Sequence, residues 1–89
     1  MFENEIRELF DLSMRTMEES NAYVEFKTDS YSNTAVILIR DDGFDMYKGF
    51  DGHYTIYNNS EILENISRKE YANAKAHLER LLEEGRCGA

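Results

Sequence analysis

The sequence predicts an α+β fold in which a four-stranded antiparallel meander carries an N-terminal and a C-terminal helix packed on one face. Three observations support this prediction. Apolar residues recur at three- and four-residue steps near both ends of the chain, which is typical of amphipathic helices. In the middle of the chain the apolar period changes to two, which is typical of strands. Two Asp-Gly pairs lie in this middle region, and this dipeptide favours tight hairpin turns.

The first helix is expected over residues 2–20, because its apolar stripe ends before Ser20 and Asn21, and asparagine tolerates the left-handed conformation that follows many helices. Short polar turns then separate four further segments. We expect strands at about residues 22–28, 34–41, 44–49 and 53–58. Because short connections make neighbouring strands antiparallel, the economical arrangement is a meander with both helices on one face.

The second helix is expected over about residues 61–84, and residues 85–89 are expected to form a tail. Ser60 can cap its first turn with a side-chain oxygen. Ser67 and Glu70 also have the spacing of a capping box, so a break in the helix near residue 66 stays open. Gly85 is a suitable stop, since glycine readily takes the left-handed conformation that ends a helix.

The first Asp-Gly pair, Asp42-Gly43, is interpreted as a two-residue hairpin turn. This register places Arg40 opposite Asp45, and the two side chains would form a cross-strand pair of opposite charge. The predicted core face of the two strands consists of Ile37, Ile39, Phe44 and Met46.

The second pair, Asp51-Gly52, requires a different loop. A two-residue turn there would move Ile56 to the face opposite the core, because a slip of one residue inverts every side chain of a strand. A three-residue loop of Phe50, Asp51 and Gly52 keeps Ile56 in the core. In this interpretation Gly52 supplies the left-handed residue of a bulged loop.

The chain has 89 residues, which suits a single domain, and eighteen acidic residues oppose ten basic ones to give a net charge of −8. This charge argues against binding to nucleic-acid phosphates and to anionic membranes, both of which require basic residues. It allows docking onto a basic surface of another protein, although it also serves solubility alone. The lone cysteine, Cys87, excludes an internal disulfide. With no apolar run long enough to span a membrane, we expect a cytoplasmic protein.

No catalytic site, metal site or cofactor is expected. The aspartates at 41, 42, 45 and 51 lack the spacing of a calcium loop. His53, His77 and Cys87 are too scattered to predict a zinc site or a nucleophile–histidine pair, and His77 is expected to be solvated on its helix. Stacking of nucleic-acid bases on exposed tyrosines is disfavoured by the acidic surroundings.

Two binding surfaces are predicted, and the first is an acidic end of the sheet. A four-stranded meander would bring the predicted Asp42-Gly43 turn to the same end of the sheet as the start of the last helix. The expected acidic end consists of Asp41, Asp42, Asp45, Glu61 and Glu64. These carboxylates either only solvate a turn and a helix start, or they offer phosphate-like charges to the basic residues of a nucleic-acid-binding protein.

The second predicted surface is the sheet face without helices, with Tyr23, Tyr47 and Tyr57 as its contact residues. Exposed aromatic faces often mark interfaces, because tyrosine buries a large area and keeps a polar group. Cross-strand pairing of tyrosines on a solvated sheet is the alternative. If the face binds a second copy, the chain would be a structural or adaptor module that forms a homodimer.

A short, acidic, tyrosine-rich chain of this layout without catalytic motifs resembles the small inhibitors encoded by phages and mobile elements, including anti-CRISPR proteins. The resemblance rests on size, charge and the order of elements, and no residue is matched to a family position. It implies a non-enzymatic inhibitor in the cytoplasm of a host cell. Such an inhibitor would mimic nucleic acid and occupy a basic groove on its partner, a nucleic-acid-binding enzyme.

Overall fold

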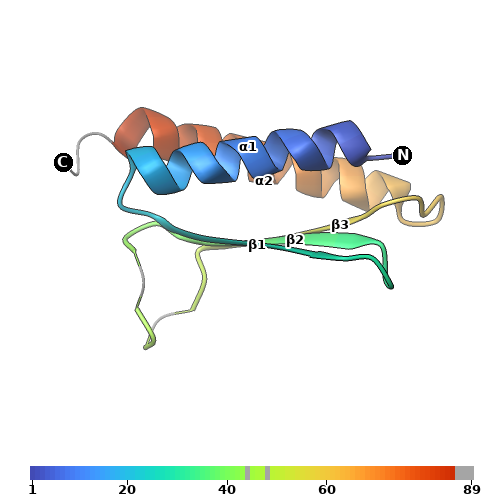
Figure 1. The fold of residues 1–89 in the computed structure, drawn as a ribbon, viewed down its shortest axis with the longest axis horizontal. Coiled ribbons are helices and arrows are strands. Elements are labelled where there is room, and N and C mark those ends of the chain that lie inside the picture. The colour runs from blue at the N-terminus through green and yellow to red at the C-terminus, as the bar shows by residue number, and fades with distance from the viewer. Residues whose placement is uncertain (44, 48, 86–89) are drawn as a thin grey trace.

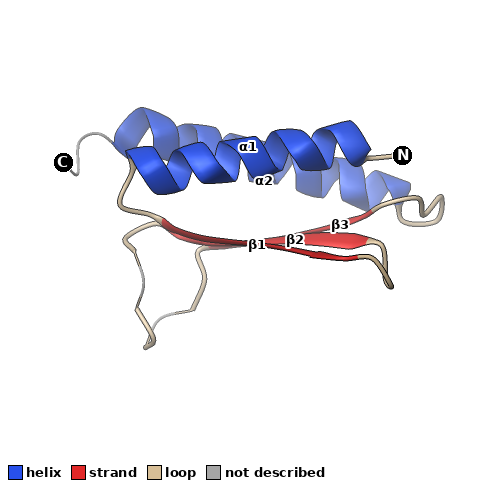
Figure 2. Ribbon diagram, viewed as in Figure 1, coloured by secondary structure: helices blue, strands red, loops and turns tan. Residues whose placement is uncertain are grey.

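The computed structural model describes residues 1–43, 45–47 and 49–85, which form two helices and three strands (Figure 1). In chain order the elements are α1 (Glu3–Glu19), β1 (Tyr23–Asp29), β2 (Thr34–Arg40), β3 (Gly52–Tyr57) and α2 (Glu64–Gly85). The strands form one antiparallel sheet in the order β1-β2-β3, and both helices lie on the same face of it (Figure 2). The predicted α+β class with an antiparallel sheet is therefore confirmed.

The prediction of four strands is wrong, because the described part of residues 44–49 is not a strand. Strand β2 pairs directly with β3 in the register Ala35 to Ile56, Ile37 to Tyr54 and Ile39 to Gly52. One edge of β2 can hold only one partner strand. Residues 52–57 are the better partner because they place Ile56 fully inside the core, whereas Met46 is 71% exposed.

The first Asp-Gly pair does form a turn, although not the predicted two-residue hairpin. The backbone N–H of Gly43 donates to the carbonyl of Arg40 at 3.2 Å, so the turn encloses Asp41 and Asp42. Gly43 follows with a φ of 97°, a conformation that glycine adopts at little cost. The chain then leaves the sheet on the face opposite the helices (Figure 1).

Three further register predictions change with the missing strand. Asp45 is not part of a strand, so its predicted cross-strand pair with Arg40 is wrong; in the sheet Arg40 lies opposite Tyr23 of β1. The predicted three-residue loop is also wrong, because Gly52 begins β3 and does not take a left-handed conformation. Phe44, predicted to lie in the core, falls outside the described residues, as does Cys87.

The core lies between the sheet and the two helices, and it follows the predicted alternation. Val24, Ile37, Ile39 and Ile56 point toward the helices and are buried. The other large buried side chains are Leu9 and Leu12 of α1, Leu78 and Leu81 of α2, and Phe2, which directly precedes α1. Full burial of each such side chain stabilises the fold by roughly 1.5–3 kcal/mol.

Helices α1 and α2 run parallel, side by side, because the chain reverses direction four times between them, once at each connection from α1 through the three strands to α2. Near the start of α1, the Arg68 guanidinium lies 5.5 Å from the centre of the Phe2 ring. One turn further on, Glu8 accepts a hydrogen bond from Tyr71 and lies 3.3 Å from the Lys75 ammonium. Both helices consequently end at the same end of the molecule, where β2 ends and β3 begins (Figure 1).

Helix α2 begins at Glu64 and continues without a break near residue 66. Ser60 accepts a hydrogen bond from the Leu63 N–H at 3.3 Å, so it closes the turn before α2 and does not cap the first turn of the helix as predicted. Ser67 does not cap a helix, because it lies within α2 and is fully buried. Its hydroxyl accepts from the Tyr57 N–H at 2.9 Å and lies 3.4 Å from the Tyr57 carbonyl, so it joins α2 to β3.

Candidate functional site

The predicted acidic end is divided between the two ends of the molecule. Strand β2 ends at the same end where β3 begins, so Asp41 and Asp42 lie there. With three strands in place of four, β3 finishes at the opposite end, and Glu61 and Glu64 lie with it. Glu64 is also paired with Arg68 at 2.9 Å. The predicted grouping of five carboxylates is therefore wrong.

A different group of acids gathers where both helices end. Seven carboxylates lie there, at the last turns of α1 and α2 and at the two ends of the connection between β2 and β3. We call this group the acidic pole, and its members are Glu18, Glu19, Asp41, Asp42, Asp51, Glu83 and Glu84. Asp45 lies further along the connection, where its carboxylate accepts a hydrogen bond from the Tyr47 N–H at 2.9 Å.

Asp41 is the most constrained carboxylate of the acidic pole. Its Oδ1 lies 2.6 Å from His77 Nε2, and its Oδ2 accepts from Arg80 Nη2 at 3.0 Å. Burial on its own raises the pKa of Asp41, but the hydrogen bonds from His77 and Arg80 outweigh it, and the net result is a lowered pKa. Asp41 is therefore ionised at neutral pH and fastens the end of β2 to α2.

His77 connects this carboxylate to the sheet. An ionised carboxylate only accepts hydrogen bonds, so His77 Nε2–H donates to Asp41. In the neutral imidazole, Nδ1 then accepts from the Tyr54 hydroxyl, 2.7 Å away. Burial and the nearby charges of Glu70 and Asp41 raise the pKa of Tyr54. The tyrosine therefore stays protonated and acts as a donor, which fits a structural contact between β3 and α2.

The sequence prediction for His77 was wrong, since its side chain is only 8% exposed. The signal that could have found it is its spacing: His77 lies three residues after Ala74 and next to Leu78, both of which are fully buried. Tyr54 shares the even-numbered face of β3 with Ile56, which places it toward α2.

A cavity of about 380 Å³ opens beside Asp41, between the ends of the two helices. Its charged lining consists of four carboxylates and one guanidinium: Asp41, Asp42, Asp51, Glu84 and Arg80. Asp51 Oδ2 accepts from the Asp41 N–H at 2.7 Å, and Arg80 reaches Glu84 at 3.2 Å. Among the described residues, no ion pair or side-chain hydrogen bond occupies Asp42. The cavity is thus an anionic opening suited to a cationic side chain.

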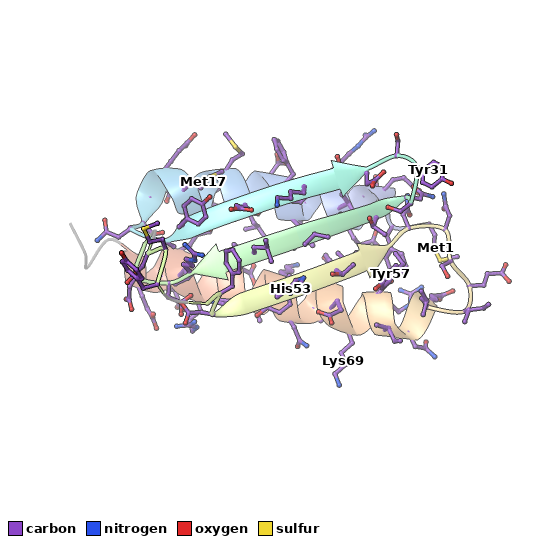
Figure 3. All side chains as sticks on the ribbon, turned by 90° about the horizontal axis from the view of Figure 1, so that it is seen from below. Met1, Met17, Tyr31, His53, Tyr57 and Lys69 are labelled. Carbon is purple, nitrogen blue, oxygen red and sulfur yellow. The ribbon has the colours of Figure 1, made fainter. Side chains whose placement is uncertain are left out.

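Two of the three predicted tyrosines lie on the open sheet face. Tyr57 and Tyr23 alternate with the buried residues of β3 and β1, and Figure 3 shows Tyr57 on the face turned away from the helices. Tyr47 is not part of the sheet and is 92% exposed in the connection between β2 and β3. In the sheet it is His53 that lies opposite Leu38.

Comparisons with protein-family models, with curated proteins and with solved structures found no match to this chain. Within residues 1–43, 45–47 and 49–85, no cluster of three or more His, Cys, Asp or Glu side chains is arranged to hold a metal ion. Neither helix, over its described length, is apolar enough to cross a membrane.

Proposed function

We propose that this chain is a non-enzymatic protein-binding inhibitor whose acidic pole docks onto a basic surface of another protein. The observation that carries the proposal is the cavity at the pole, where Asp42, Asp51 and Glu84 surround a space open to solvent. A guanidinium entering there would meet carboxylates on more than one side, and arginine pairs with carboxylates through two parallel hydrogen bonds.

The electrostatics of the two helices support a binding role for the pole. The C-terminal end of a helix carries a partial negative charge, and basic residues are favoured there. Neither helix has a basic residue in its last turn, and each has two glutamates near its end. Without a partner, each such acid costs the fold about 0.3–1 kcal/mol. Glu19 and Glu84 each pair with an arginine four residues earlier in the same helix, which offsets part of this cost. Among the described residues Glu18 and Glu83 have no such ion pair, and a basic surface on a partner would supply the opposite charge.

The class of partner follows from the same charges. Carboxylates at the ends of two helices and one turn present negative charge in the way that phosphates do, and basic grooves that bind nucleic acid are shaped to receive it. Binding at such a groove would exclude the nucleic acid. An inhibitor of the anti-CRISPR type, acting on a nucleic-acid-binding enzyme, fits this description.

The test compares three versions of the chain as bait for basic nucleic-acid-binding proteins. The first is the wild type, and the second carries Asp42→Lys and Glu83→Lys at the pole. The third carries Glu61→Lys and Glu64→Lys at the opposite end, which gives the same net charge. We expect the wild type and the opposite-end variant to capture the same partner, and the pole variant to lose it.

Two further measurements sharpen this test. Capture should weaken steeply when salt rises from about 50 to 200 mM, because counterions screen the contacts. Added nucleic acid should release the captured partner, since both occupy one groove. If both variants capture the partner as well as the wild type does, the pole is not the binding surface. Equal loss by both variants would show that only net charge matters.

A further inference from the structure

The two outer edges of the sheet are covered to different extents. At the β3 edge, Ser67 of α2 bonds both backbone groups of Tyr57. These groups point outward, since the neighbouring Asn58 N–H points inward to Asn33 at 2.9 Å. Within the described residues, the outer edge of β1 has no strand beside it. Along such an uncovered edge, alternate residues of β1 direct their backbone groups outward, where another strand can bond them.

The helix above β1 leaves apolar side chains exposed along this edge. Phe10, Met14 and Met17 follow one another at four- and three-residue steps and are 46%, 39% and 41% exposed. We call these three residues the edge stripe. The Phe10 ring packs edge-on against Phe26 of β1, with 5.4 Å between ring centres. Figure 3 shows Met17 on the side of the molecule where β1 is the outer strand.

From these observations we propose that a second copy of this chain pairs with β1, strand to strand and antiparallel, about a two-fold axis at Phe26. The two sheets then join into one continuous sheet, with all helices on one face. The edge stripes of the two copies meet above the new strand pair and bury their exposed apolar surface. This interface lies on other residues than the acidic pole.

The sequence of β1 explains why the partner is a second copy and why this register is chosen. β1 runs from Tyr23 to Asp29, so an axis at Phe26 pairs its full length. Glu25 then faces Lys27 of the second copy, and Lys27 faces Glu25. An axis at Glu25 would oppose two glutamates, and an axis at Lys27 would oppose two lysines. Of these three registers, only the central one sets opposite charges against each other, which stabilises antiparallel pairs.

The same two residues already attract one another within one chain, where Lys27 Nζ lies 3.2 Å from Glu25 Oε2. Both side chains lie on the open face of the sheet, because Val24 between Tyr23 and Glu25 is buried. In the proposed dimer the four charges of two copies form one alternating group. The residues of β1 that point toward the helices are Val24, Phe26 and Thr28, none of which is charged, so nothing there repels the second edge stripe.

The test reverses the charges at residues 25 and 27 of β1 and measures self-association by sedimentation equilibrium. Glu25→Lys alone would set lysine against lysine, and Lys27→Glu alone would set glutamate against glutamate. We expect each variant to self-associate about tenfold more weakly than the wild type, because two like-charged pairs replace two attractive ones. An equimolar mixture of the two variants should regain the dimer as a heterodimer, and the double variant Glu25→Lys/Lys27→Glu should regain it as a homodimer.

Matched controls change the same charges elsewhere. Glu61→Lys and Lys69→Glu alter exposed residues away from β1 and should leave self-association unchanged. Met14→Lys, in the edge stripe, should weaken the dimer without unfolding the chain, since its side chain is partly exposed. Circular dichroism confirms that each variant is folded.

Several results would overturn the proposal. A wild-type chain that stays monomeric at the highest soluble concentration has no such interface. A dimer that is not regained by mixing the two variants uses another register or surface. A dimer lost on Tyr57→Glu but unchanged by Glu25→Lys lies on the open sheet face. Salt separates this interface from the acidic pole, because screening relieves the repulsion between two chains of charge −8, whereas it weakens docking on a basic partner.

Discussion

At the residue scale, Gly52 shows that an Asp-Gly pair can be needed for packing and not for a turn. A Cβ at this position would lie 2.6 Å from His77 Nδ1 and 2.7 Å from the Tyr54 ring. Both neighbours are held in place by the hydrogen bonds that run from Tyr54 through His77 to Asp41. The absent side chain therefore makes room for the contact that fastens α2 to the sheet.

We predict that Gly52→Ala destabilises the fold by about 1–3 kcal/mol, since an added methyl group must displace a buried imidazole. The measurement is urea unfolding at neutral pH. Gly49→Ala is the matched control, because nothing lies within 4 Å of its Cβ position, and we expect its midpoint to match the wild type. Equal midpoints for Gly52→Ala and the wild type would mean that His77 can move away without cost.

At the element scale, α2 and β3 are joined by the buried hydroxyl of Ser67, a residue whose spacing from Glu70 predicted a helix cap. Ser67 and Ser13 are both fully buried serines within helices. Ser67 bonds the backbone of Tyr57, whereas the Ser13 hydroxyl has no hydrogen-bond partner among the described residues. The two serines have the same burial and differ in hydrogen bonding, so they form a natural pair for mutation.

Ser67→Ala should lower the free energy of unfolding by about 1–3 kcal/mol, because it leaves a backbone N–H of β3 buried without its acceptor. Ser13→Ala should be neutral or slightly stabilising, since it removes a buried hydroxyl that bonds nothing in the described structure. Hydrogen exchange at the Tyr57 amide measures the first effect locally. A similar loss of stability in both variants would indicate that packing, and not the hydrogen bond, is what Ser67 supplies.

At the scale of the whole molecule, the parallel helices determine where the charge lies. Both helices end where β2 ends and β3 begins, so acids that are distant in the chain form one pole. The two helix ends concentrate unfavourable charge there, at a cost to stability that a basic partner would offset. We therefore expect that substitutions at this end of the molecule that raise the stability of the fold also weaken binding to the partner.

The double variant Glu18→Lys/Glu83→Lys tests this trade. It halves the net charge of −8 and places favourable charges at both helix ends. We predict that the free energy of unfolding rises by about 0.6–2 kcal/mol, and the melting temperature by several degrees. Binding to the basic partner should weaken at the same time. A lower melting temperature would contradict the view that these glutamates destabilise the fold.

The sequence by itself determined the element types, the direction of each strand's core face and the excess of acid. These properties depend on local periodicity and composition, so Val24, Ile37, Ile39 and Ile56 could be assigned to the core from their spacing alone. The end of α1 also followed from a local signal, since the helix stops at Glu19, directly before Ser20, whereas α2 begins at Glu64, three residues later than expected, and includes Gly85.

Only the tertiary structure decided which segment pairs with β2, and that choice placed every candidate site residue. Residues 44–49 and 52–57 both have strand-like patterns. Residues 52–57 pair with β2 because α2 makes contacts with them: Ser67 bonds the Tyr57 backbone and His77 bonds Tyr54. Those contacts join residues far apart in the chain, and no local pattern records them. With three strands in place of four, α2 runs in the opposite direction to the one predicted, so Glu61 and Glu64 lie away from Asp41 and the C-terminal end of α2 lies near it, beside the end of α1.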